Sequence, residues 1–168
     1  MQTTIQRAKE HQERWDEIVR DPSLRDLPYR VETNRRGQIV LSPHKAEHSD
    51  LQEDIQNLLR QHAPEGRQPP EYPIVTSEGV KQADVVWMSP DRRAEMKTTG
   101  DPPTLAPEIC VEVLSPNNRW TNIEEKIDLY LEAGAREVWV VDTERHIRIF
   151  GPEEMETSKI APDCPRHL

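Results

Sequence analysis

The stretch Ile109–Leu114, with the sequence ICVEVL, is a continuous apolar run that holds one carboxylate near its centre. A short run of this kind is typical of a β-strand that is buried on both faces. The motif Thr121-x-x-Glu124 predicts a capping box that opens a helix, and Gly134 predicts the end of that helix. A second buried strand is expected at Glu137–Val141. Together these elements predict a right-handed crossover between two parallel strands.

Outward from this unit, the apolar periodicity predicts the other elements. Helices are expected at 4–20 and 44–62, and strands at Tyr29–Thr33, Gln38–Leu41, Glu71–Thr76, Ala83–Met88 and His146–Phe150. The first two strands form a hairpin. Residues 89–107 contain four prolines and predict a short helix and a mobile loop. The expected fold class is α/β, a mixed β-sheet flanked by helices.

Three segments are expected along the chain. Residues 1–26 form an N-terminal helical arm, residues 27–151 form the domain, and residues 152–168 form a C-terminal tail punctuated by prolines. The apolar stripe of the arm is thin, so the arm is expected either to dock loosely or to pair with a second copy. A homodimer is therefore expected.

The composition limits the size of the core and the classes of function. The chain has 168 residues, of which 34% are hydrophobic and 32% are charged. An average soluble domain is about 45–50% apolar with glycine included, so a small core is expected. No apolar run approaches the roughly 18 residues that cross a bilayer, and the first residues lack a secretory signal. Cys110 and Cys164 form no disulfide framework or metal-spaced pair, so a cytoplasmic protein without membrane contact is expected.

Two carboxylates stand in strands that are otherwise apolar. Glu112 lies in the middle of its strand, and Asp84 opens the run Asp84–Met88. A buried, ionised carboxylate costs several kcal/mol unless it is paired or coordinates a metal. Either a buried Arg or Lys neutralises each acid, or the two acids share a cation. Hard divalent ions prefer oxygen ligands from a few carboxylates together with water. Two such carboxylates on two core strands therefore favour a shared metal ion.

Lys126 is the one charge at the edge of the apolar stripe of its predicted helix. Its stem could simply cover the rim of the core while the ammonium stays in water. However, this helix directly follows the strand of Glu112, so the ammonium can return to the end of that strand. A lysine beside metal-bound carboxylates can orient water or offset charge on a phosphorane-like transition state.

Three further polar residues are weaker candidates. Glu32, in an alternating strand, faces either the same cavity or solvent. Glu47 and His48 lie on the apolar side of the second helix and are assigned to a supporting layer around the site. Glycine-rich phosphate loops, G-x-S-x-G and H-E-x-x-H motifs are absent from the sequence.

With these residues in place, the sequence resembles the Uma family of restriction-endonuclease-like proteins, within the PD-(D/E)XK nuclease superfamily. The resemblance covers about residues 28–151. The segments that carry it are Ile39–Pro43 with Glu47-His48, Val80–Trp87, Val111–Asn118, Glu125-Lys126, Tyr130, Gly134 and Glu137–Trp139.

The resemblance implies a restriction-endonuclease-like fold and a Mg²⁺- or Mn²⁺-dependent phosphodiesterase site. It implies that Asp84 and Glu112 are metal ligands, completed by the backbone carbonyl of Val113. It also implies that Lys126 is the catalytic lysine and that Glu32 is an additional upstream acid.

The sequence departs from the superfamily pattern at three points. The residue pair Pro-Asp is Ala83-Asp84 here, and Leu114 stands where the lysine normally follows the glutamate. In the family that the chain resembles, this lysine lies on the following helix, and the position of Lys126 agrees with that arrangement. An acid often found shortly before the lysine is Asn122 here. These departures leave both proposed metal ligands in place.

Three functions remain open. The first is a metal-dependent endonuclease that hydrolyses DNA by activated-water attack, and the second is a catalytically inactive nuclease-fold binding module. The third is a metal-dependent hydrolase of a smaller phosphoester. The formal net charge of −9 argues against tight, non-specific nucleic-acid binding. Basic pairs in loops, Arg35-Arg36 and Arg92-Arg93, could still meet a phosphate backbone, so weak, salt-sensitive and metal-dependent DNA binding is expected.

Overall fold

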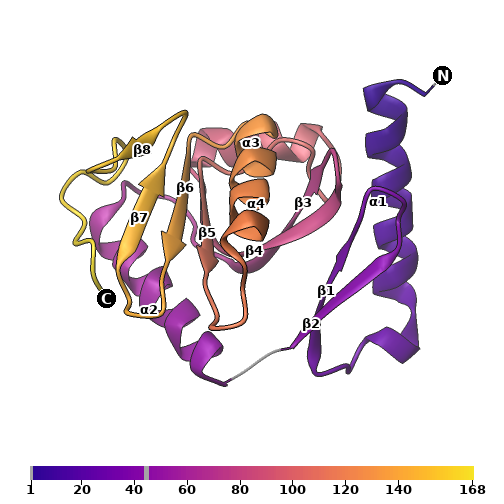
Figure 1. Ribbon diagram of the computed structural model, residues 1–168. Coiled ribbons are helices and arrows are strands. Elements are labelled where there is room, and N and C mark those ends of the chain that lie inside the picture. Colours follow the sequence, from indigo (N-terminus) through magenta and orange to yellow (C-terminus); the bar gives the residue numbers. More distant parts are fainter. Residues whose placement is uncertain (1, 44–45) are drawn as a thin grey trace.

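Figure 1 shows a computed structural model of the protein, which describes residues 2–43 and 46–168. Its helices are α1 (Thr4–Arg20), α2 (Ala46–His62), α3 (Pro90–Thr98) and α4 (Trp120–Glu132), with a short 3₁₀ helix η1 (Pro22–Leu24). Its strands are β1 (Tyr29–Thr33), β2 (Ile39–Pro43), β3 (Pro70–Thr76), β4 (Gly79–Trp87), β5 (Ile109–Val113), β6 (Glu137–Val141), β7 (Ile147–Phe150) and β8 (Glu154–Met155). Residue 44, the expected start of the second helix, lies outside the described residues. No helix in the described part of the chain is long and apolar enough to cross a membrane.

Six of these strands form one mixed sheet in the order β3-β4-β5-β6-β7-β8, and β1 pairs with β2 in a separate two-stranded sheet. Strands β5 and β6 are parallel, as the crossover through α4 requires, and the other neighbouring strands are antiparallel. Helices lie on both faces of the large sheet (Figure 1). The structure therefore confirms the predicted α/β class, a mixed sheet flanked by helices.

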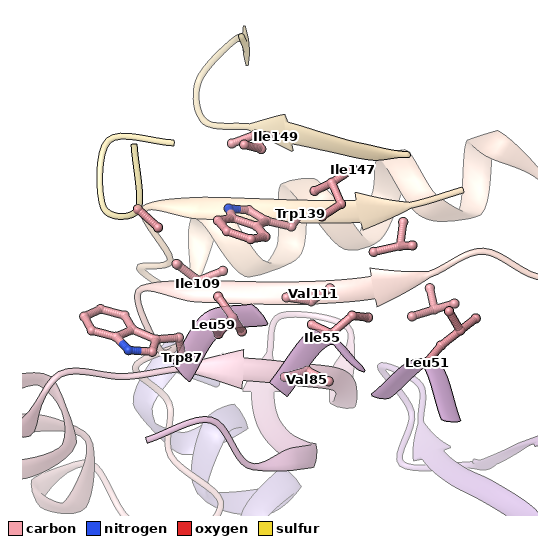
Figure 2. Packing of buried hydrophobic residues seen from close by; sticks show 13 residues of the cluster. Leu51, Ile55, Leu59, Val85, Trp87, Ile109, Val111, Trp139, Ile147 and Ile149 are labelled. Atoms are coloured by element: carbon pink, nitrogen blue, oxygen red, sulfur yellow. The ribbon is translucent and has the colours of Figure 1, made fainter. Parts of the chain in front are cut away.

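The core has two layers because the central strands β4, β5 and β6 alternate apolar side chains between two faces. On one face, α2 packs Leu51, Ile55 and Leu59 against the sheet, where Trp139 is also buried (Figure 2). On the other face, α4 contributes a stripe that includes Ile127 and Tyr130. Both faces of the central strands are thus apolar, which explains why their sequences read as continuous runs.

One local prediction is wrong. Helix α4 begins at Trp120, and its N-cap residue is Arg119, whose side chain makes no capping hydrogen bond. Thr121 already lies in the first turn of the helix, so its hydroxyl is not at the N-cap position that a capping box requires. The predicted end is confirmed, because Gly134 follows the C-cap residue Ala133 with a φ of +107°.

The two terminal segments pack on the domain. Trp15 and Ile18 of α1 are buried with Val80 of β4 in a small third cluster. The segment 152–168, expected as a tail, adds β8 to the sheet and buries Ala161 in the core. The carboxylate of Glu137 holds this segment, since it accepts hydrogen bonds from the Ser158 hydroxyl at 2.7 Å and the Lys159 amide at 2.7 Å.

The β1–β2 hairpin lies against β4 and is fixed to it through side chains. Thr33 Oγ1 accepts the amide of Val80 at 2.8 Å, and the Thr33 carbonyl accepts Lys81 Nζ at 2.8 Å. One residue earlier, Glu32 Oε2 accepts the amide of Gln82 at 2.6 Å. Because side chains two residues apart in a strand share a face, Arg30 and Glu32 lie on the same side of β1. This docking brings both of them to the acids of the large sheet.

Candidate active site

Asp84 and Glu112 form the centre of the site. Strands β4 and β5 pair Val85 with Val111, and extending this antiparallel register by one residue places Asp84 across from Glu112. Directly opposite residues in an antiparallel pair have Cβ atoms about 4.5–5.5 Å apart on one face of the sheet. Asp84 is 0% exposed and Glu112 is 2% exposed. Two buried acids this close are strongly destabilising unless cations lie beside them.

Asp84 is held in the ionised form by three donors. Its Oδ1 forms an ion pair with the Arg30 guanidinium and a 2.9 Å contact with His48 Nε2. Its Oδ2 accepts the backbone amide of Val113 at 2.7 Å. Burial raises the pKa of Asp84, but the positive charge of Arg30 and the contacts with His48 and Val113 outweigh this effect and hold the pKa well below its usual range.

Glu112 is in a different environment. Its Oε1 accepts the Tyr130 hydroxyl at 2.6 Å and lies 3.4 Å from Lys126 Nζ. Burial raises the pKa of Glu112 to about 7; the Lys126 charge opposes the rise, whereas the neighbouring Asp84 charge adds to it. Glu112 is therefore a carboxyl group that exchanges its proton near neutral pH.

Lys126 joins Glu112 to Glu32. Its Nζ lies 3.0 Å from Glu32 Oε2 and 3.4 Å from Glu112 Oε1. Burial lowers the pKa of Lys126, but the carboxylates of Glu112 and Glu32 reverse this effect and raise the pKa above its usual value. Lys126 consequently keeps its proton at neutral pH and acts as a fixed positive charge.

The structure brings together four of the residues predicted from the sequence: Asp84, Glu112, Lys126 and Glu32. His48, predicted to support the site, contacts Asp84. Glu47 is exposed on the first turn of α2, and within residues 2–43 and 46–168 it forms no hydrogen bond or ion pair with this cluster. The predicted role of Val113 concerns its backbone carbonyl; in the structure, its backbone amide donates a hydrogen bond to Asp84.

Arg30 and Tyr130 also contact the two central acids, although the sequence pattern did not assign either residue to the site; Tyr130 entered only as one of the residues that carry the family resemblance. Tyr130 follows Lys126 by four residues, which places both on one side of α4; that spacing was a usable signal for the hydrogen bond to Glu112. Arg30 precedes Glu32 by two residues in a predicted strand, so the two residues were expected to share a face. Only the docking of the hairpin shows that this face meets Asp84.

The donor chemistry of the cluster fits a hard divalent cation, because Asp84 and Glu112 present carboxylate oxygens side by side and His48 lies next to them. Within residues 2–43 and 46–168, however, no three His, Cys, Asp or Glu side chains gather around one point. Positively charged side chains already pair with these acids: Arg30 pairs with Asp84, and Lys126 pairs with both Glu112 and Glu32. A metal ion at the pair would therefore take two protein carboxylates and complete its shell with other oxygens.

The protein is thus an α/β domain, a mixed sheet flanked by helices that holds two buried acids on its central strands. The chain belongs to the Uma2 family, whose model, described as "Putative restriction endonuclease", matches residues 15–163. Among solved structures, the fold is similar to one titled as a "putative nuclease belonging to DUF820 from Anabaena variabilis ATCC 29413". That similarity has a TM-score of 0.62 and 18% sequence identity, and covers 82% of this chain and 86% of the other. No curated protein matches the chain.

Proposed function

We propose that the protein is a divalent-metal-dependent endonuclease of the PD-(D/E)XK type that hydrolyses DNA phosphodiester bonds by attack of an activated water. The observation that carries the proposal is the placement of Asp84 and Glu112 across from each other, with Lys126 of the following helix beside Glu112. Membership of the Uma2 family supports the same chemistry.

In this proposal Asp84, Glu112 and the backbone carbonyl of Val113 hold Mg²⁺ or Mn²⁺. When bound, the ion would polarise a phosphoryl oxygen and lower the pKa of a water ligand. Glu112 must give up its proton to act as a ligand, and its pKa near 7 allows this at neutral pH.

Lys126 contributes charge to the proposed reaction. Because its pKa is raised, Lys126 does not serve as a base at neutral pH. Its ammonium can instead orient the attacking water and offset negative charge that develops on phosphorus oxygens. Glu32, at 3.0 Å, fixes the position of this ammonium, and the amide of Gln82 fixes Glu32 in turn.

A plasmid-cleavage assay with Mg²⁺ or Mn²⁺ tests the proposal. We expect Asp84→Asn and Lys126→Ala to abolish metal-dependent nicking. The matched controls are Asp128→Asn, an exposed acid on the same helix as Lys126, and Lys159→Ala, an exposed lysine of the C-terminal segment; both should cleave like the wild type. Equal background nicking by wild type, Asp84→Asn and Lys126→Ala would refute the enzymatic function.

A catalytically inactive nuclease-fold binding module is the second candidate. One observation favours it: each acid of the site already has a protein cation within ion-pairing distance. Calorimetry separates the two candidates, because the module needs no divalent ion. Retained DNA binding without any uptake of Mg²⁺ or Mn²⁺ would select the module.

We also propose a homodimer. Large apolar side chains are exposed on the N-terminal arm and the hairpin: Ile5, Val19, Tyr29, Val40 and Leu41. Burial of such residues against a second copy would stabilise a dimer, and two active sites would suit cleavage of both DNA strands. Light scattering tests this assembly, and a monomer mass would contradict it.

A further inference from the structure

The ion pair between Arg30 and Asp84 joins two parts of the fold that share no backbone ladder. Arg30 belongs to the separate β1–β2 sheet, whereas Asp84 belongs to β4 of the large sheet. The Asp84 side chain is fully buried, and the Arg30 side chain is 14% exposed. Arg30 is therefore the more exposed partner of this ion pair.

This position matters because the same carboxylate is the proposed metal ligand. A guanidinium and a divalent ion at one carboxylate repel each other, and the low polarity of a buried site strengthens this repulsion. Arginine keeps its charge at all ordinary pH values, so its competition with a metal ion cannot be relieved by loss of a proton. His48, the other side-chain donor on Oδ1, can become neutral.

We propose that Arg30 is the resident counter-cation of Asp84, which a divalent metal ion must displace, and that this guanidinium sets the metal affinity of the site. The inference rests on the proposed function for the existence of the metal site. It adds that the wild-type site binds metal weakly because metal binding includes breaking the Arg30–Asp84 pair. Because Asp84 is fully buried and Arg30 is partly exposed, Arg30 is the partner that moves when a metal ion binds.

Calorimetric titration of the full chain with Mn²⁺ tests this inference directly. Arg30→Gln removes the competing charge and keeps a polar side chain, so the Kd for Mn²⁺ should fall by about tenfold or more. Arg30→Lys keeps the charge but loses the fork geometry, so its Kd should lie between those of Arg30→Gln and the wild type. The matched control is Arg148→Gln: Arg148 pairs with Glu154 at 2.8 Å outside the cluster, and its loss should leave the Kd unchanged.

Thermal unfolding gives a second measurement that does not depend on catalysis. Without metal, Arg30→Gln leaves Asp84 with fewer positive partners and should unfold at a lower temperature than the wild type. Mn²⁺ should raise its Tm more than it raises that of the wild type, because the ion replaces the lost charge. If the variant is unfolded without metal, recovery of its circular-dichroism spectrum on adding Mn²⁺ supports the inference, and failure to recover contradicts it.

The outcomes separate this inference from the proposed function. Equal Mn²⁺ affinity of wild type and Arg30→Gln, or weaker binding by the variant, overturns the role of Arg30 and leaves the metal site intact. Absence of Mn²⁺ binding by the wild type and both Arg30 variants at millimolar concentrations overturns the metal site itself, and the role of Arg30 with it.

Discussion

Asp84 and Glu112 lie across from each other on β4 and β5, and the protein shifts their carboxyl pKa values in opposite directions. Burial raises both pKa values, but only Asp84 has a guanidinium, a histidine and a backbone amide on its oxygens. Glu112 has a neutral hydroxyl and a more distant ammonium. The pair therefore carries one permanent negative charge and one that depends on pH near neutrality.

The first prediction concerns the pH dependence of stability in the metal-free protein. The pKa of Glu112 is about 7 when folded and 4.5 ordinarily, so the folded state binds this proton more tightly. Its stabilising contribution is fully present below about pH 4.5 and is lost as the pH rises through 7, on the order of 3 kcal/mol in all. Urea unfolding of Glu112→Gln should show a flatter pH profile than the wild type in this window.

His48 requires a control in the same experiment. Its hydrogen bond to Asp84 raises its pKa, so its contribution to stability is also lost as the pH rises. In His48→Gln, Glu112 still titrates, so the free energy of unfolding should keep the larger part of its wild-type dependence on pH. Asp84 acts at the acid end, because its lowered pKa contributes stability that is lost only as the pH falls below its ordinary value. A Glu112→Gln profile as steep as that of the wild type would contradict the raised pKa.

Tyr130→Phe tests the neutral donor on Glu112. The variant keeps the buried ring but removes the hydroxyl that lies 2.6 Å from Oε1, and an acceptor that loses its buried partner costs about 1–3 kcal/mol. Urea unfolding should show a loss of this size. The control is Tyr29→Phe, whose ring is 46% exposed on β1 and whose change should cost little. An unchanged free energy of unfolding in Tyr130→Phe would show that the hydroxyl is dispensable.

The sequence predicts most of the fold because its decisive signals are local. The strands Ile109–Val113 and Glu137–Val141 are apolar on both faces, and that pattern follows from their central position in the sheet. The predicted start of α4 is wrong because the short capping motif at Thr121 falls inside the helix, which begins at Trp120. Glu112 and Asp84 were predictable because each is a charge in an apolar run.

Arg30 illustrates what the sequence does not reveal. It is separated by 54 residues from Asp84, and the two belong to different sheets. Their contact depends on how the hairpin docks on β4, through hydrogen bonds such as that of Thr33 Oγ1 with the Val80 amide. Alternation within β1 shows which residues share a face, but it carries no information about what that face meets.

The docking of the hairpin supplies the next prediction, at Gly79. Its φ of +96° disfavours any other residue, and an added Cβ would lie 2.6 Å from the carbonyl oxygen of Thr33 and also clash with that of Asn34. Gly79→Ala should therefore push the hairpin from β4 and destabilise the fold by roughly 2 kcal/mol or more. Hydrogen exchange of the Val80 and Gln82 amides, which donate to the hairpin, should accelerate.

Gly37 provides the matched control for this change. It lies in the turn between β1 and β2 with a φ of +76°, and the nearest atom to an added Cβ is Arg14 Cγ at 3.4 Å. Gly37→Ala thus bears the same kind of backbone strain without a clash against the domain. Its Val80 and Gln82 amides should exchange more slowly than those of Gly79→Ala. Equal protection in both variants would mean that close packing at Gly79 does not hold the hairpin.

The last prediction separates the site from another buried acid, Glu137. In the part of the chain that the structure describes, the donors to its carboxylate are neutral: the Trp139 indole at 3.0 Å, the Ser158 hydroxyl and backbone amides of the C-terminal segment. This carboxylate therefore anchors the segment through neutral hydrogen bonds. Glu137→Ala leaves these donors unpaired, at about 1–3 kcal/mol for each that stays buried. Limited proteolysis should then cut the segment 156–168, while the Kd for Mn²⁺ stays unchanged.

The control for this prediction is Glu154→Ala, which removes a surface ion pair with Arg148 and should lower the free energy of unfolding by about 1 kcal/mol or less. A change in Mn²⁺ affinity in Glu137→Ala would show that Glu137 is coupled to the acids of the site, although their hydrogen-bond partners are different.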